Sequence, residues 1–358
     1  MRFMPDPGET RLDAGDVLSD FCWFPQDYVP LGRTMSFVRT DRTTLAQQPF
    51  LDHRWNRGGY AQTSLTVDSI AGEISPDAPL PHLNFIWHTS FCCSTLIASA
   101  LNVAHRNLSL SEPVVLVTAA DMKRAGAYRD GKASPRLPEI ALRLLARRPD
   151  PHTAITVKPS NFANILIRDA ARHTTGKSLF LYSDLPSFLL SVAKSGLQLS
   201  KYARRLFFGI VQDDGKPLRW PAADLFQMSD LEIAAIAWHM QIAEFRRSWA
   251  ELGEGRVASL DCDAFLADPR TALEKLDAFF GYGFGPETIR KIVEGPVLSR
   301  HAKLPQAPFS AQQRRVEQQA VRQFLGADLD RIAEWSYGAY AEAVRGAPLP
   351  SALLPAGR

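Results

Sequence analysis

Residues 84–97 read NFIWHTSFCCSTLI, and this stretch decides which fold the chain can adopt. A short apolar run ends in small polar residues and two adjacent cysteines, and a helical pattern follows. We expect a strand at 84–87, a tight turn at 88–93 and a helix that begins near Ser94 and Thr95. Such a turn directs backbone N–H groups at a phosphate. A cysteine site and a piece of buried core are the alternatives.

Other short apolar runs predict further buried strands, separated by helical patterns. Together with 83–88, the expected strands are 114–117, 154–158, 178–182 and 256–260. The expected helices are 94–105, 136–148, 161–171, 185–196 and 229–253, the last opening with a capping box of Ser229 and Glu232. Strands that alternate with helices of this length predict an α/β fold whose central parallel sheet has helices on both faces.

The chain divides by composition into three parts. Residues 1–80 are rich in Pro, Gly, Arg and aromatic residues with weak periodicity, which predicts an irregular N-terminal arm packed on the main domain. The main domain is expected at 81–305, with an insertion at 197–228 that carries a basic helix. A C-terminal helix and tail follow at 306–358.

Bulk composition excludes several classes of protein. The chain has 358 residues, of which 46% are hydrophobic and 22% charged, as in ordinary globular proteins. A net charge of +3 argues against nucleic-acid binding. Four cysteines form neither a disulfide ladder nor a paired zinc pattern, so we expect a reduced, cytoplasmic protein without a metal. Polar residues in the most apolar window, 83–104, argue against a transmembrane segment.

The turn resembles the 5'-phosphosulfate loop of sulfotransferases, in which an apolar strand is followed by G-T/S-P-R-S-G-T-T-L-L. His88 stands at the first glycine, Thr89 at the Thr/Ser, Ser90 at the proline, Phe91 at the arginine, Cys92 at the serine, Cys93 at the second glycine, and Ser94 and Thr95 at the hydroxyl pair. The family's cation is therefore missing from the turn. The ATPase pattern GxxxxGK[ST] is also absent, because the turn has neither glycine nor lysine.

Three later segments resemble sulfotransferases in the same order. ITVKPSN (155–161) is similar to the strand end that carries the family's lysine, here Lys158. LFLYSDLPSFLLSVAK (179–194) is similar to the 3'-phosphate segment, with Ser191 at its serine and Ser183 at its arginine. RVASLDCDAFLADPRTALEKLDAFFG (256–281) is similar to a late structural block.

The resemblance implies a P-loop NTPase-like three-layer sandwich and an enzymatic activity. The activity is transfer of a sulfuryl group from 3'-phosphoadenosine 5'-phosphosulfate to a hydroxyl or amine. The acceptor would be a small molecule or a glycan- or lipid-like compound, and the chemistry requires no metal. Residues Thr89 to Thr95 would contact the phosphosulfate, and Ser183 and Ser191 would lie at the 3'-phosphate.

Sulfuryl transfer needs cations near the transferring group and a base for the acceptor proton. Lys158 is the candidate cation, with an exposed lysine at a strand end as the alternative. The family places a glutamate just after the helix, so Glu112 is a candidate base, or else a capping or salt-bridging carboxylate. His88 is the second candidate base, and a buried structural histidine is its alternative.

Other candidate residues have weaker signals. Arg300 and Lys303 in SRHAKLP (299–305) are expected to replace the missing 3'-phosphate arginines, or to form a solvated cluster. Cys92 and Cys93 at a helix start are expected to have lowered thiol pKa values, with small-residue packing as the alternative.

Two other functions stay open at this stage. The replacement of the loop cation by Phe91 favours a non-catalytic nucleotide- or phosphate-binding protein that kept the fold. A kinase-like enzyme would need a loop lysine, which is missing, and a Mg²⁺-holding acid such as Asp261. An oligomer is possible.

Overall fold

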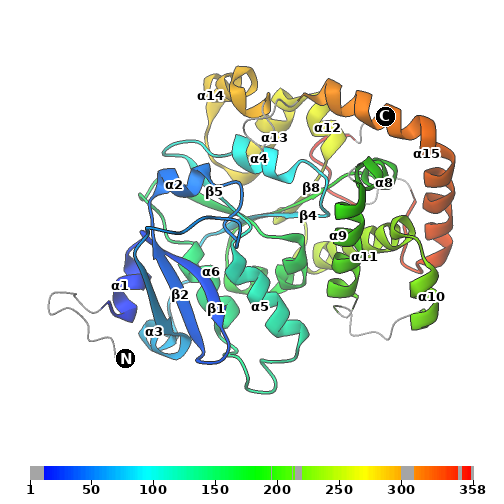
Figure 1. Cartoon of the computed structure of the whole chain (residues 1–358). Helices are drawn as coiled ribbons and strands as arrows, with labels where there is room; N and C mark the ends of the chain where they lie inside the picture. Colours follow the sequence, from blue (N-terminus) through cyan, green and yellow to red (C-terminus); the bar gives the residue numbers. More distant parts are fainter. Residues whose placement is uncertain are drawn as a thin grey trace.

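The computed structural model describes residues 12–194, 196–211, 213, 220–299, 310–345 and 349–355. A five-stranded sheet lies at its centre (Figure 1). The strands are β4 (Asn84–His88), β5 (Asn107–Ser111), β6 (Ala154–Lys158), β7 (Ser178–Tyr182) and β8 (Val257–Asp261). Their order is β5-β6-β4-β7-β8, and every pairing is parallel. The chain leaves β4 toward one side of the sheet and later crosses to the other, so ligands are expected at the carboxyl end of β4.

Helices cover both faces of this sheet because its strands are apolar on both faces. Phe85 and Trp87 of β4 belong to one hydrophobic cluster, and Ile86 belongs to another. The first cluster includes residues of α5 (Val114–Arg124), α6 (Leu137–Leu145), η1 (Asn161–Leu166), α7 (Ile167–His173) and α8 (Leu185–Lys194). The second includes residues of α4 (Ser94–Ala100), α12 (Cys262–Ala267), α13 (Pro269–Phe280) and α14 (Gly285–Glu294). The predicted three-layer α/β sandwich, with a central parallel sheet and helices on both faces, is therefore confirmed.

One expected strand was wrong and another was missed. Residues 114–117, expected as a strand, form the first turn of helix α5, which begins after Pro113. The missed strand is β5, which has the sequence NLSLS and lies at the edge of the sheet. This strand was missed because it buries polar side chains. Asn107 Oδ1 accepts a hydrogen bond of 2.8 Å from Thr156 Oγ1 on β6, so a neighbouring strand satisfies a group that would otherwise oppose burial.

The described part of the N-terminal region is more regular than expected. It forms an antiparallel sheet of β1 (Trp23–Val29), β2 (Thr34–Arg39) and β3 (Gln62–Thr66), with α1 (Ala14–Ser19), α2 (Arg42–Gln47) and α3 (Val67–Glu73). Met35 and Phe37 are buried in the same cluster as Phe85. This sheet packs on the α5 and α6 side of the main domain (Figure 1). The described part of this region therefore has regular strands and helices despite its weak periodicity.

The predicted insertion contains helices α9 (Gly196–Ile210) and α10 (Ala222–Gln227). Helix α9 packs against α11 (Asp230–Leu252), which begins with the predicted capping box of Ser229 and Glu232. After the short helix η2 (Pro296–Leu298), the long helix α15 (Ala311–Ala339) runs beside α8 and α11 (Figure 1). None of the described helices is both long and apolar enough to cross a membrane.

Candidate active site

The turn between β4 and α4 has an unusual backbone. Ser90, Phe91 and Cys93 adopt positive φ angles of 77°, 52° and 55°. Such conformations cost about 1 kcal/mol or more for each non-glycine residue, so the surroundings must enforce them. This turn therefore stores strain at the edge of the sheet where ligands are expected.

His88 is one of the groups that hold the turn. Its Nδ1 accepts a hydrogen bond of 3.1 Å from the Ser90 backbone N–H, and its Nε2 lies 3.1 Å from the Pro159 carbonyl oxygen. A carbonyl can only accept, so the proton of a neutral imidazole must be on Nε2. Both ring nitrogens are thus engaged in shaping the turn.

Phe91, which stands where the phosphosulfate loop was expected to have an arginine, lies among other aromatic side chains. The Phe91 ring packs edge-on against Phe188 and Tyr202, with centroid distances of 5.5 and 5.8 Å. Tyr202 on α9 donates a hydrogen bond of 2.6 Å to Asn161 Oδ1, and its oxygen lies 2.8 Å from Ser90 Oγ. Helix α9 is therefore attached to the turn through Tyr202.

Lys158 and Glu112 form a buried ion pair beside the turn. Lys158 ends β6, Glu112 follows β5, and their Nζ and Oε1 atoms are 2.6 Å apart. The Lys158 side chain is 0% exposed, and its backbone carbonyl accepts a hydrogen bond of 2.7 Å from the Glu112 N–H. The alternative of an exposed lysine at a strand end is therefore wrong for Lys158, whereas the alternative of a salt-bridging carboxylate is correct for Glu112.

A second cation reaches Glu112 from the N-terminal region. Arg54 Nη2 lies 2.9 Å from Glu112 Oε2 and 2.5 Å from Asp52, and its guanidinium lies over the Phe50 ring. Burial alone would raise the pKa of Glu112, but Lys158, His88 and Arg54 outweigh it and lower that pKa to about 2. Glu112 is therefore ionised at neutral pH.

Sequence reasoning missed Arg54. Backbone hydrogen bonds from Leu51 N–H to Ser111 and from Val114 N–H to the Leu51 carbonyl attach its segment to the end of β5. These contacts join positions far apart in the chain, and the segment around Arg54 has no sequence motif that predicts them.

A cavity of about 580 Å³ opens at the carboxyl ends of β4, β5 and β6. Its lining combines aromatic, acidic and basic side chains with residues of the turn. The lining includes Phe50, Asp52, Arg54, His88, Ser90, Phe91, Ser94, Glu112, Val114, Val117, Asp121, Phe162, Tyr202 and Arg205. Lys158 is not part of this lining, but it contacts Glu112, which is. A volume of this size suits a small molecule.

The remaining residues of the turn are mostly buried. Thr89, Cys92 and Thr95 are inaccessible or nearly so, and Cys93 is half-buried. Thr95 Oγ1 is buried with no hydrogen-bond partner among the described residues. Burial raises the pKa of the Cys92 thiol to about 12, so the expected thiolate character is wrong for this residue.

Ser183 and Ser191 lie on the other side of the turn. Ser183 is buried, and its Oγ donates a hydrogen bond of 3.3 Å to the Phe91 carbonyl. Ser191 lies on α8, where its Oγ donates to the Ser187 carbonyl at 2.9 Å. Arg300 and Lys303, expected near this side, lie outside the described residues.

Asp261 caps a helix near these serines. Its Oδ1 accepts hydrogen bonds from the backbone N–H groups of Asp263 at 2.7 Å and Ala264 at 3.1 Å. Burial, together with nearby Asp263 and Asp184, raises the pKa of Asp261 to about 6. Within the described ranges no group of three or more His, Cys, Asp or Glu side chains could hold a metal ion.

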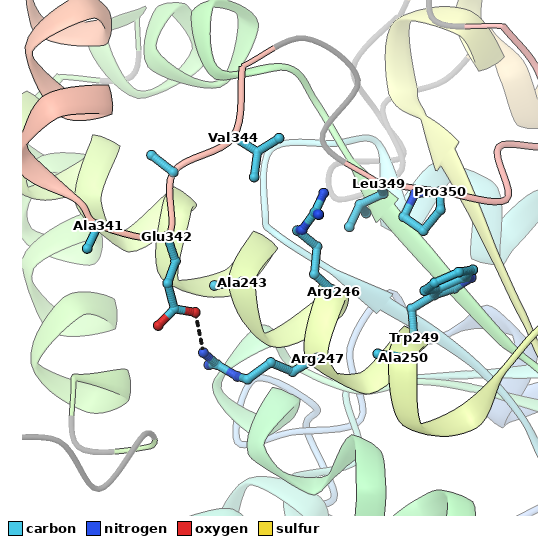
Figure 2. A pocket seen from close by; sticks show the side chains of 11 residues that line it. Ala243, Arg246, Arg247, Trp249, Ala250, Ala341, Glu342, Val344, Leu349 and Pro350 are labelled. Carbon is cyan, nitrogen blue, oxygen red and sulfur yellow. Dashed lines mark hydrogen bonds and ion pairs between the residues drawn. The ribbon is translucent and has the colours of Figure 1, made fainter.

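A second cavity, of about 840 Å³, lies between α11 and the segment after α15 (Figure 2). Arg247 donates a hydrogen bond of 2.8 Å to Glu342 across it, and Trp249 lies nearby. None of the residues predicted from the sequence lines this cavity.

Comparisons with known proteins give only distant structural similarities. No protein-family model and no curated protein matches the chain. A sulfotransferase domain from the curacin biosynthetic pathway is similar with a TM-score of 0.41 and 13% identity, over 72% of this chain and 98% of that one. Sulfotransferase STF9 from Mycobacterium avium is similar with a TM-score of 0.38 and 12% identity, over 71% and 78%. At these values, the function has to be argued from the site.

Proposed function

We propose that this protein transfers a sulfuryl group from 3'-phosphoadenosine 5'-phosphosulfate to a hydroxyl or amine acceptor. The observation that carries the proposal is the Lys158–Glu112 pair, buried beside a strained turn and a cavity at one edge of a parallel sheet. This arrangement combines a cation, a carboxylate and a tight turn before a helix, where an α/β sheet binds its ligands.

The residues of the turn suit the 5'-phosphosulfate of the donor. Thr95 Oγ1 is a buried hydroxyl without a partner among the described residues, which an anionic oxygen would satisfy. Residues Thr89 to Thr95 would hold the phosphosulfate, and Ser191 would contact the 3'-phosphate. Ser183 serves the turn itself through its bond to Phe91.

Glu112 is the base in this proposal, and His88 positions the turn. The acceptor gives its proton to Glu112, its oxygen or nitrogen forms a bond to sulfur, and the bond from sulfur to the phosphate oxygen breaks. With a pKa of about 2, Glu112 is a weak base while Lys158 neutralises it. When Lys158 turns toward the charge that develops on the leaving phosphate, Glu112 becomes more basic. Lys158 therefore couples removal of the acceptor proton to departure of the leaving phosphate.

A non-catalytic nucleotide-binding protein is the second candidate. The aromatic cluster around Phe91 favours it, because aromatic rings stand where the loop cation was expected and do not stabilise the charge of a transferring sulfuryl group. This candidate predicts nucleotide binding without turnover.

Calorimetric titration with 3'-phosphoadenosine 5'-phosphate, ATP and GTP tests the proposal. We expect the bisphosphate alone to bind, with at least about tenfold weaker affinity in Lys158→Ala, or about 1.4 kcal/mol. A double variant, Lys158→Met with Glu112→Gln, removes both buried charges and separates lost binding from lost folding. Preference for ATP or GTP, or no binding of the bisphosphate, would contradict the proposal. Binding without sulfuryl transfer to any acceptor would favour the second candidate.

A further inference from the structure

The charges around the 580 Å³ cavity leave one cation without a carboxylate partner. Three carboxylates line the cavity, and each already contacts a cation. Asp52 contacts Arg54, Glu112 contacts Lys158 and Arg54, and Asp121 contacts Arg124, which also binds Asp213 outside the cavity. In the described part of the chain, Arg205 forms no ion pair.

Arg205 is nevertheless held at the cavity. It lies on α9 three residues after Tyr202, so both side chains are on the same face of the helix. Tyr202 attaches this face to Ser90 and Asn161. The Arg205 guanidinium lies 5.6 Å from the centre of the Phe162 ring, a cation–π arrangement that orients it without neutralising it.

The lining of the cavity combines polar groups with apolar side chains. Phe50, Phe91 and Phe162 provide aromatic surface, and Val114 and Val117 add aliphatic surface from α5. Such walls bury the body of an organic molecule, while a few polar groups fix its orientation. Glu112 lines the same space and is the proposed base.

We propose that the acceptor is an aromatic or otherwise apolar hydroxyl compound that carries an anionic group, and that Arg205 binds this group. A guanidinium offers paired N–H donors that match a carboxylate, and Arg205 need not break an existing ion pair to do so. This inference rests on the proposed function, in which the hydroxyl of the acceptor receives the sulfuryl group. Binding of the anionic group by Arg205 can be measured separately.

Three phenols of nearly the same shape test the inference by ligand-observed NMR: 4-hydroxyphenylacetate, its neutral amide, and tyramine. We expect the carboxylate to bind the wild-type protein about tenfold more tightly than the amide, equivalent to about 1.4 kcal/mol. Arg205→Gln should abolish this preference. Lys201→Gln removes the same charge from an exposed position of α9 outside the cavity lining and should leave the preference unchanged.

The outcomes separate this inference from the proposed function. Equal binding of the three phenols, a preference for tyramine through Asp121, or no binding of the carboxylate would overturn the role of Arg205. Preference for the carboxylate that survives in Arg205→Gln would also overturn it. If the carboxylate preference depends on Arg205 but the bisphosphate nucleotide does not bind, recognition of the anion stands and sulfuryl transfer fails.

Discussion

The two sides of the β4–α4 turn balance their charges differently. On the side of β5 and β6, Glu112 is bonded to Lys158 and Arg54, and its pKa is lowered to about 2. On the side of β7 and β8, Asp261 has no ion-pair partner among the described residues, and its pKa is raised to about 6. The same edge of one sheet thus stabilises one carboxylate as an anion and disfavours the charge of the other.

This difference shows that the partners of a buried carboxylate, rather than its place in the fold, decide its charge. The first side contains a buried cation, Lys158, paired with its carboxylate. The second uses its carboxylate to cap helix α12. Substitutions on both sides of the turn would break or sharpen the contrast.

Lys158→Ala should have the largest effect on stability. It leaves Glu112 with Arg54 alone, and removing one partner of a buried pair costs about 3 kcal/mol or more. The free energy of unfolding in urea would show this loss. The double variant Lys158→Met with Glu112→Gln should recover most of it, because no buried charge remains. Equal stability of Lys158→Ala and wild type would show that the pair is not buried in solution.

The two carboxylates should give opposite pH dependences of stability. The folded pKa of Glu112, about 2, is below its usual 4.5, so its stabilisation is present above pH 4.5 and is lost as pH falls. The folded pKa of Asp261, about 6, is above its usual 3.8, so the free energy of unfolding falls as pH rises between these values.

Asp261→Asn should remove the second effect, since asparagine also caps helices. We expect it to raise the free energy of unfolding at neutral pH by about 1–2 kcal/mol, measured by urea unfolding across the pH range. Glu112→Gln should instead flatten the acid side of the profile. An unchanged slope near pH 5 in Asp261→Asn would contradict this assignment.

Ser191→Ala should have the smallest effect. Its Oγ donates a hydrogen bond to the Ser187 carbonyl within the same helix, and the loss of such a local bond should change thermal stability little. If Ser191 contacts the 3'-phosphate, affinity for 3'-phosphoadenosine 5'-phosphate should fall by about 1 kcal/mol. Affinity for adenosine 5'-phosphate, which lacks that phosphate, should not change. A parallel loss for both nucleotides would show that the serine acts through α8 instead.

Parts of the site were predictable because their signals are local. An apolar run followed by small polar residues predicted β4, the turn and α4, and Ser229 with Glu232 predicted the start of α11. Strand β5 could not be predicted because its polar residues are satisfied only by a neighbouring strand. The expected thiolate at Cys92 failed for a similar reason: burial, which depends on the whole fold, outweighs the position at a helix start.

By itself, the sequence determined the alternation of strands and helices, the turn after β4, and the place of Lys158 at a strand end. Periodicity and capping act over a few residues, so one segment suffices to show them. Only the tertiary structure brought Arg54 to Glu112 and placed Arg205 on the cavity through α9. Electrostatic interactions depend on distance in space and on burial, and neither is set until distant segments pack together.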